Sequence, residues 1–199
     1  MHLPHRPDCA SLSGMDNVDT SAARYSRGAI VLHWLIAVLI VLNIAAAWVS
    51  EGMSKADRAT VMGNHKAIGI TVLLLTVLLI LWRLMHRRPP LLESLKAWEA
   101  ALSRVVHVGF YFLMLAIPLT GWAMTSAFSK GAGVSLFGLV IVPALPVGFD
   151  KPTAGLFAEL HTVLAFLMIA LIVLHVAGAL KHQFLDRDGT LRRMVPWLR

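Results

Sequence analysis

The sequence has little cysteine and little charge. Its one cysteine, Cys9, excludes a disulfide framework, a cysteine-rich zinc or iron–sulfur site, and the CxxCH motif that attaches haem covalently. Charged residues make up 15% of the 199 residues, whereas soluble domains usually carry about a quarter. Apolar residues make up 57%, so the polar surface is too small to cover a globule in water, and we expect the bilayer to be the solvent.

The sequence also lacks the short motifs of several enzyme classes. It contains no phosphate-binding loop, no dinucleotide fingerprint, no GxSxG and no HExxH. Hydrolase and nucleotide chemistry therefore have no support.

Four apolar runs are each long enough to cross about 30 Å of hydrocarbon, which takes roughly 20 helical residues. They cover about residues 28–49, 65–84, 105–127 and 159–181. Pro118 lies inside the third run, where a membrane helix tolerates it. The sequence predicts an all-α membrane protein, a bundle of four transmembrane helices formed by residues 24–199. Residues 1–23 are polar and are expected to be a disordered extension, with Met1 or Met15 as the natural start.

The basic residues predict the orientation of the bundle. Of the 18 Lys and Arg residues, 13 lie before the first run, between the second and third, and after the fourth, and 5 lie in the two other loops. The positive-inside rule then places both termini and the loop between the second and third runs in the cytoplasm. The net charge of +7 is thus explained by membrane lipid rather than by a nucleic acid partner. The loop 128–158 is apolar but broken by Pro143 and Pro146, and we expect an interfacial or re-entrant cap, with a mobile loop as the alternative.

Histidines are the functional candidates, because ionisable groups inside membrane spans are costly and usually functional. Five of the nine belong to the predicted spans: His33, His65, His107, His161 and His175. His161 and His175 are fourteen residues apart, nearly four turns, so they share one helical face about 21 Å apart along the axis. That is the arrangement that two stacked haems require of one helix.

Depth in the membrane pairs these histidines into two layers. His65 and His161 belong near the outer face, and His33 and His175 near the cytoplasmic face. Two axial histidines close the coordination of a haem iron, which favours electron transfer over oxygen activation. A proton relay or a metal transporter should add buried carboxylates, which the predicted spans essentially lack. His107 competes with His33 or His175 as a ligand, or contacts a propionate or quinone, and His182 could do similar work.

Several strings resemble the bacterial cytochrome b561 family, which is related to the cytochrome b subunits of nickel–iron hydrogenases. They are "RYSRGAIVLHWLIAVLIVLN", "NHKAIGITVLLLTVLLILWRL", "HVGFYFLMLAIPLTGW" and the tail "RDGTLRRMVP". The resemblance covers about residues 24–197. It implies two b haems with iron ligands at His33, His65, His161 and His175.

The resemblance also implies a function, since some members oxidise superoxide at the periplasmic face and reduce ubiquinone. The leading hypothesis is a di-haem cytochrome that passes electrons from a periplasmic redox donor to quinone, with superoxide:ubiquinone oxidoreductase as its enzyme form. Lys66, Lys130 and Lys151 would attract an anion, or are simply solvated. The alternatives are a membrane-anchor subunit of a hydrogenase-like or other dehydrogenase, and a helical bundle without redox function.

Overall fold

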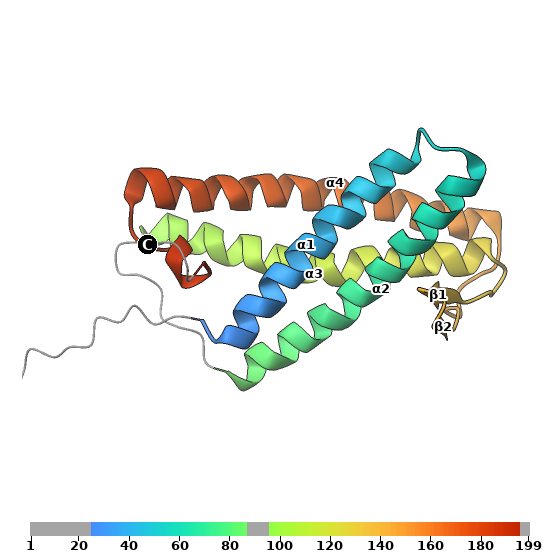
Figure 1. The fold of residues 1–199 in the computed structure, drawn as a ribbon, viewed down its shortest axis with the longest axis horizontal. Coiled ribbons are helices and arrows are strands. Elements are labelled where there is room, and N and C mark those ends of the chain that lie inside the picture. Colours follow the sequence, from blue (N-terminus) through green and yellow to red (C-terminus); the bar gives the residue numbers. More distant parts are fainter. Residues whose placement is uncertain (1–24, 87–95, 196–199) are drawn as a thin grey trace, which may run out of the picture.

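The fold is a bundle of four long helices (Figure 1). The computed structural model describes residues 25–86 and 96–195, so the predicted extension 1–23 lies outside the described residues. The helices are α1 (Arg27–Ser50), α2 (Lys55–Met85), α3 (Ala97–Phe128) and α4 (Lys151–Lys181). Each is long and apolar enough to cross a membrane. The predicted fold class is confirmed.

Three helices begin earlier than the apolar runs suggest. α2 begins at Lys55 rather than near residue 65, α3 at Ala97 rather than near 105, and α4 at Lys151 rather than near 159. The apolar run marks only the part of a helix within hydrocarbon, and the helix continues through the polar interface to a cap. Ser54 Oγ accepts from the Asp57 amide at 3.3 Å at the start of α2. His65 therefore lies nearly three turns inside α2 and not at its start, as the sequence had indicated.

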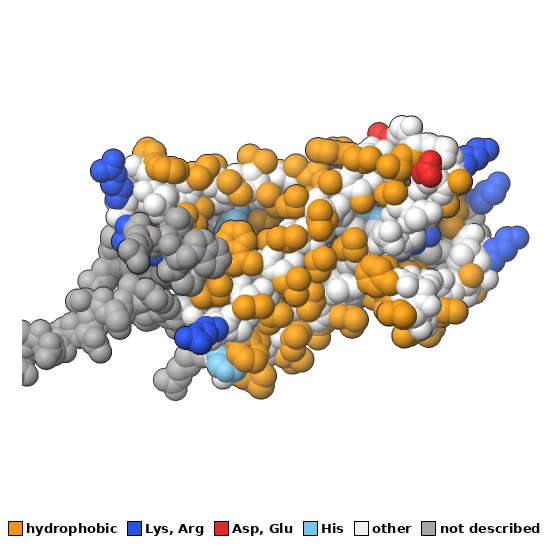
Figure 2. All heavy atoms as spheres, viewed as in Figure 1, with side chains coloured by type: hydrophobic (Ala, Val, Ile, Leu, Met, Phe, Trp, Pro, Cys, Tyr) orange, Lys and Arg blue, Asp and Glu red, His pale blue; other side chains and the backbone are white. Residues whose placement is uncertain are grey.

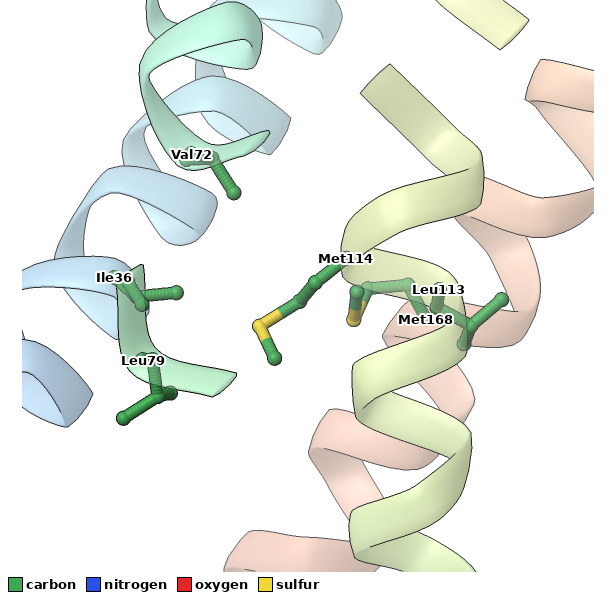
Figure 3. Close-up of a cluster of buried hydrophobic side chains, with 6 residues drawn as sticks. All are labelled: Ile36, Val72, Leu79, Leu113, Met114 and Met168. Atoms are coloured by element: carbon green, nitrogen blue, oxygen red, sulfur yellow. The ribbon is translucent and has the colours of Figure 1, made fainter. Parts of the chain in front are cut away.

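The helices pack in chain order. α1 packs against α2, α2 against α3, and α3 against α4, whereas α1 and α4 make little direct contact. The middle of the bundle is an apolar cluster from all four helices (Figure 3), formed by Ile36, Val72, Leu79, Leu113, Met114 and Met168. The space between α1 and α4 is thus left to side chains, and both helices bear histidines.

The outer surface of the bundle is apolar over its middle and charged at its two ends (Figure 2). Large apolar side chains such as Leu74, Leu81, Val163 and Val173 are exposed along the helices. In water this surface would be a severe aggregation liability. In a bilayer it is the surface that lipid covers, so the protein is a membrane protein.

A short antiparallel hairpin, β1 (Val134–Leu136) and β2 (Val140–Val142), lies in the loop between α3 and α4. Three residues, 137–139, connect the paired Leu136 and Val140; Phe137 and Gly138 have positive φ (51° and 78°), and the Leu139 amide donates to the Leu136 carbonyl at 2.9 Å. Trp122 Nε1 donates to the Pro143 carbonyl at 3.0 Å and ties the segment to α3. The loop predicted as a cap is therefore an ordered structure at the end of the bundle.

Candidate functional site

The first histidine pair joins α2 to α4. The ring centres of His65 and His161 lie 6.2 Å apart with their planes at 70°. Nδ1 of His65 donates to the Asn43 carbonyl at 3.1 Å, and Nδ1 of His161 donates to the Ile117 carbonyl at 2.9 Å. Because a carbonyl oxygen can only accept, Nδ1 carries the proton in each ring and Nε2 keeps its lone pair. A histidine oriented in this way is prepared to bind a metal through Nε2.

The second pair joins α1 to α4. The ring centres of His33 and His175 lie 6.3 Å apart with their planes at 61°. The His33 ring also meets Trp34 edge-on at 5.5 Å, and the His175 ring meets Phe110 at 5.3 Å. These aromatic rings fix the two imidazoles on either side of the space between α1 and α4.

Both separations suit two axial ligands of one metal. An imidazole nitrogen binds a transition metal at about 2 Å and the ring centre lies about 1 Å further back, so two opposed imidazoles place their centres roughly 6 Å apart. The histidine pairs therefore fit haem iron, and they occur twice along α4.

A cavity of about 640 Å³ adjoins the first pair. Its volume lies within the range of roughly 300–1,000 Å³ that is usual for cofactor sites. Its walls are mostly apolar, with few polar groups; among the lining residues are Asn43, His65, Gly69, Gly121, Trp122 and His161. A flat apolar macrocycle with a metal at its centre suits such walls.

Gly121 is a site residue that sequence reasoning missed. A Cβ at this position would lie 3.0 Å from His161 Cε1 and 3.1 Å from its Nδ1. The glycine thus lets the His161 ring lie directly against α3 and reach the Ile117 carbonyl one turn away. The only signal in the sequence was the string "PLTGW", in which nothing distinguishes this glycine from one that serves helix packing.

His107 lies with the second pair but on a third helix. Its ring centre is 5.6 Å from that of His175, at 88°, and its Nδ1 donates to the Ser103 carbonyl at 2.6 Å. The separation of His33 from His175 matches that of the first pair, and the separation of His107 from His175 is shorter. The geometry therefore favours His33 as the partner of His175, with His107 beside them.

His182 lies apart from both pairs in its bonding. Its Nδ1 is 2.8 Å from Asp188 Oδ2 and 3.1 Å from Asp186 Oδ2. Burial raises the pKa of Asp188, but hydrogen bonds from Thr190 and the charge and hydrogen bond of His182 outweigh burial and hold that pKa below its usual value. The sequence predicted a similar role for His182 and His107, but their contacts differ. His182 belongs to a charged network at the end of α4, whereas Nδ1 of His107 donates to the Ser103 carbonyl.

Acidic groups are scarce in the interior. Within the described ranges 25–86 and 96–195, the side chains of Glu99 and Asp188 are enclosed, 8% and 7% exposed, and both lie near helix ends, Glu99 2.8 Å from Lys181 and Asp188 2.8 Å from His182. A chain of carboxylates for proton or metal transport is therefore absent from this part of the molecule. Four membrane helices with two histidine pairs between them suit a membrane cytochrome.

The chain belongs to the prokaryotic cytochrome b561 family, whose model matches residues 24–197. It is 33% identical to cytochrome b561 homolog 2 of Escherichia coli K12, over 86% of this chain and 91% of that protein. It is 28% identical to the probable superoxide oxidase CybB of Yersinia pestis, over 87% of this chain and 96% of that protein. A cytochrome b562 of Cereibacter sphaeroides is 26% identical over 88% of this chain. The family implies b-type haem and electron transport.

Proposed function

We propose that this protein carries electrons through a bacterial inner membrane by way of two b haems. His65 and His161 would be the axial ligands of the outer haem, and His33 and His175 those of the inner haem. The observation that carries the proposal is the repeated ring separation, 6.2 Å in one pair and 6.3 Å in the other. His161 and His175, one from each pair, lie about 21 Å apart along α4.

The protein and the haem would have different roles in electron transfer. The haem supplies one-electron redox chemistry, and the protein supplies ligation, orientation and a low dielectric. Two histidines on each iron leave no open position for oxygen, which suits electron transfer. The Nδ1 bonds of His65 and His161 to backbone carbonyls hold the rings in place and increase the basicity of Nε2.

The loop charges support an orientation of the bundle, from which we infer a direction of transfer. With both termini in the cytoplasm, the His65–His161 pair faces the periplasm. A donor would deliver electrons there, and ubiquinone would take up two electrons and two protons to become ubiquinol. The name of the Yersinia relative supports superoxide, which gives up one electron to become dioxygen. Lys66 lines the cavity beside His65 and would attract such an anion.

The experiment is a haem count joined to a donor assay. The purified protein should contain about two b haems per chain, visible as an α band after dithionite reduction. Superoxide should reduce them rapidly, and added ubiquinone should then reoxidise them. The absence of a b-type α band would contradict the whole proposal, whereas two haems that superoxide fails to reduce would contradict only the donor.

A second candidate function is an anchor subunit that takes electrons from a periplasmic dehydrogenase. The observation that favours it is the hairpin, whose Leu139 and Ile141 side chains are 85% and 71% exposed. An apolar tip at the outer end of the bundle would suit a protein partner. A dehydrogenase that copurifies with the intact chain, and is lost when Leu139 and Ile141 are replaced by Ser, would establish this function.

A further inference from the structure

Arg83 lies in the last turn of α2 between two tyrosine rings. Its Cζ atom is 5.6 Å from the ring centre of Tyr25, just before α1, and 5.7 Å from that of Tyr111 on α3. Both separations are within cation–π range. The neighbouring Trp82 donates from Nε1 to Ser26 Oγ at 3.0 Å, which holds the start of α1, and with it Tyr25, beside α2. Three segments of the chain thus position one guanidinium.

This guanidinium has a buried donor that nothing in the described ranges uses. Arg83 Nε is enclosed and has no hydrogen-bond partner there, and no carboxylate within residues 25–86 and 96–195 pairs with the side chain. Arginine is always charged and carries five N–H donors in a planar fork. A buried donor without an acceptor costs free energy. An acceptor from outside the chain would remove that cost.

The location links Arg83 to the inner histidine pair. Tyr111 lies one helical turn from His107, whose ring contacts that of His175 at 5.6 Å. Tyr25, the other ring beside Arg83, is eight residues before His33 along the chain. The guanidinium therefore lies at the same end of the bundle as His33 and the cluster around His175, the end that the basic loops assign to the cytoplasm.

We propose that Arg83 binds a propionate carboxylate of the inner haem. The inference rests on the proposed haem between His33 and His175. A carboxylate offers two oxygens that match the planar fork of arginine, whereas a lysine can offer only a point charge. The tyrosine rings keep the fork aligned before the carboxylate arrives. A lipid phosphate has similar chemistry and is the competing source of the anion.

Infrared redox difference spectroscopy on the holoprotein distinguishes these sources. Haem labelled biosynthetically with ¹³C in its propionate carboxylates gives carboxylate bands that no lipid or side chain shares. Arg83→Gln should shift a labelled band and lower the midpoint potential of one haem, because a positive charge that favours the reduced form is lost. Arg83→Lys should restore part of the potential but leave the labelled band shifted. Arg104→Gln removes an exposed cation on α3 whose Nε donates to the Ala100 carbonyl at 3.2 Å, and it should change neither.

The possible results separate this inference from the proposed function. Labelled bands that stay unmoved in both Arg83 variants would overturn the propionate contact and leave a lipid phosphate as the anion. If Arg83→Lys has the labelled band and the midpoint potential of the wild type, a direct contact between the guanidinium and the propionate is overturned. The effect of Arg83 would then be that of its charge alone. If Arg83→Gln fails to accumulate, the band shift in Arg83→Lys decides alone. A wild-type protein with fewer than two haems would instead refute the proposed function.

Discussion

The two histidine pairs have nearly the same ring separation but different surroundings. His65 and His161 each donate to a backbone carbonyl of a neighbouring helix and border a cavity. His33 and His175 are held by aromatic rings, with His107 close by and Arg83 at the same end of the bundle. The pair of His65 and His161 is thus fixed by hydrogen bonds beside a largely apolar cavity whose lining includes Lys66, and the pair of His33 and His175 is fixed by ring packing.

This difference indicates separate tasks for the two ends. A carbonyl-bonded histidine is held in one tautomer, so the outer site is suited to hold a metal with little reorganisation. Charges near the inner site would tune the potential of a haem there and place titratable groups where a quinone takes up protons. The comparison predicts that the two sites respond separately to mutation.

The largest expected effect is the loss of one haem. Under the proposed ligation, His161→Ala would remove an axial ligand of the outer haem and His175→Ala one of the inner haem, so the haem content should fall from about two per chain to about one in each case. Haem stoichiometry and the low-temperature α band of the reduced protein measure this. His182→Ala, which disturbs only the charged network, should keep both haems. Loss of both haems in His161→Ala would show that the sites are not independent.

A smaller effect is expected at Gly121. A Cβ there lies 3.0 Å from the His161 ring, so Gly121→Ala must push the ring away from α3 and weaken its bond to the Ile117 carbonyl. Overpacking of this kind costs about 1–3 kcal/mol. We expect a lower occupancy and an altered spectrum of the outer haem only. Gly155→Ala is the matched control, because a Cβ there meets nothing within 4 Å; an equal effect of both substitutions would exclude the His161 contact as the cause.

The sequence predicts the features of this comparison that depend on a single helix, but not those that depend on contacts between helices. Four spans follow from the lengths of the apolar runs, and the alignment of His161 with His175 follows from 3.6 residues per turn. Both are properties of single helices. The sequence also predicted that His65 lies at the depth of His161, and His33 at the depth of His175. The structure places the rings of each pair side by side.

Features that depend on contacts between helices were out of reach. The start of α2 at Lys55 depends on a cap outside the hydrocarbon, so the sequence misplaced His65 at a helix end. The closeness of Gly121 to His161, and of Arg83 to Tyr25 and Tyr111, requires the packing of neighbouring helices. The apolar runs do not indicate which faces of neighbouring helices contact one another.

Substitution of Lys66 tests whether an anionic donor approaches the protein at the outer site. If superoxide is the donor, Lys66→Gln should slow the reduction of haem about threefold at low salt, and the difference should shrink as salt screens the charge. Stopped-flow reduction at two ionic strengths measures this. Arg104→Gln, on the opposite end of the bundle, should leave the rate unchanged. A rate that is independent of Lys66 at low salt would mean that this lysine is only a solvated charge.

The smallest expected effect concerns pH at the inner end. The pKa of Asp188 is lower in the folded chain than its usual value near 3.8, so its ionised form stabilises the segment after α4. That stabilisation is complete above the usual pKa and is lost as the pH falls through the lower, folded value. Asp188→Asn should therefore reduce amide protection in residues 182–195 at pH 6, and the difference from wild type should vanish in strong acid.

Hydrogen exchange corrected for intrinsic rates measures this protection, and Glu159→Gln, an exposed acid on α4, is the control. The outer end of α4 is capped by Asp150, which accepts from the Thr153 amide at 2.8 Å without a histidine in the network. If acid loosened the two ends of α4 equally, the contrast between an inner end held by a histidine–carboxylate network and an outer end capped by Asp150 without a histidine would fail. Loss of protection confined to residues 182–195 would place the pH-sensitive part of the molecule on the side of His33 and His175, where we expect quinone to take up protons.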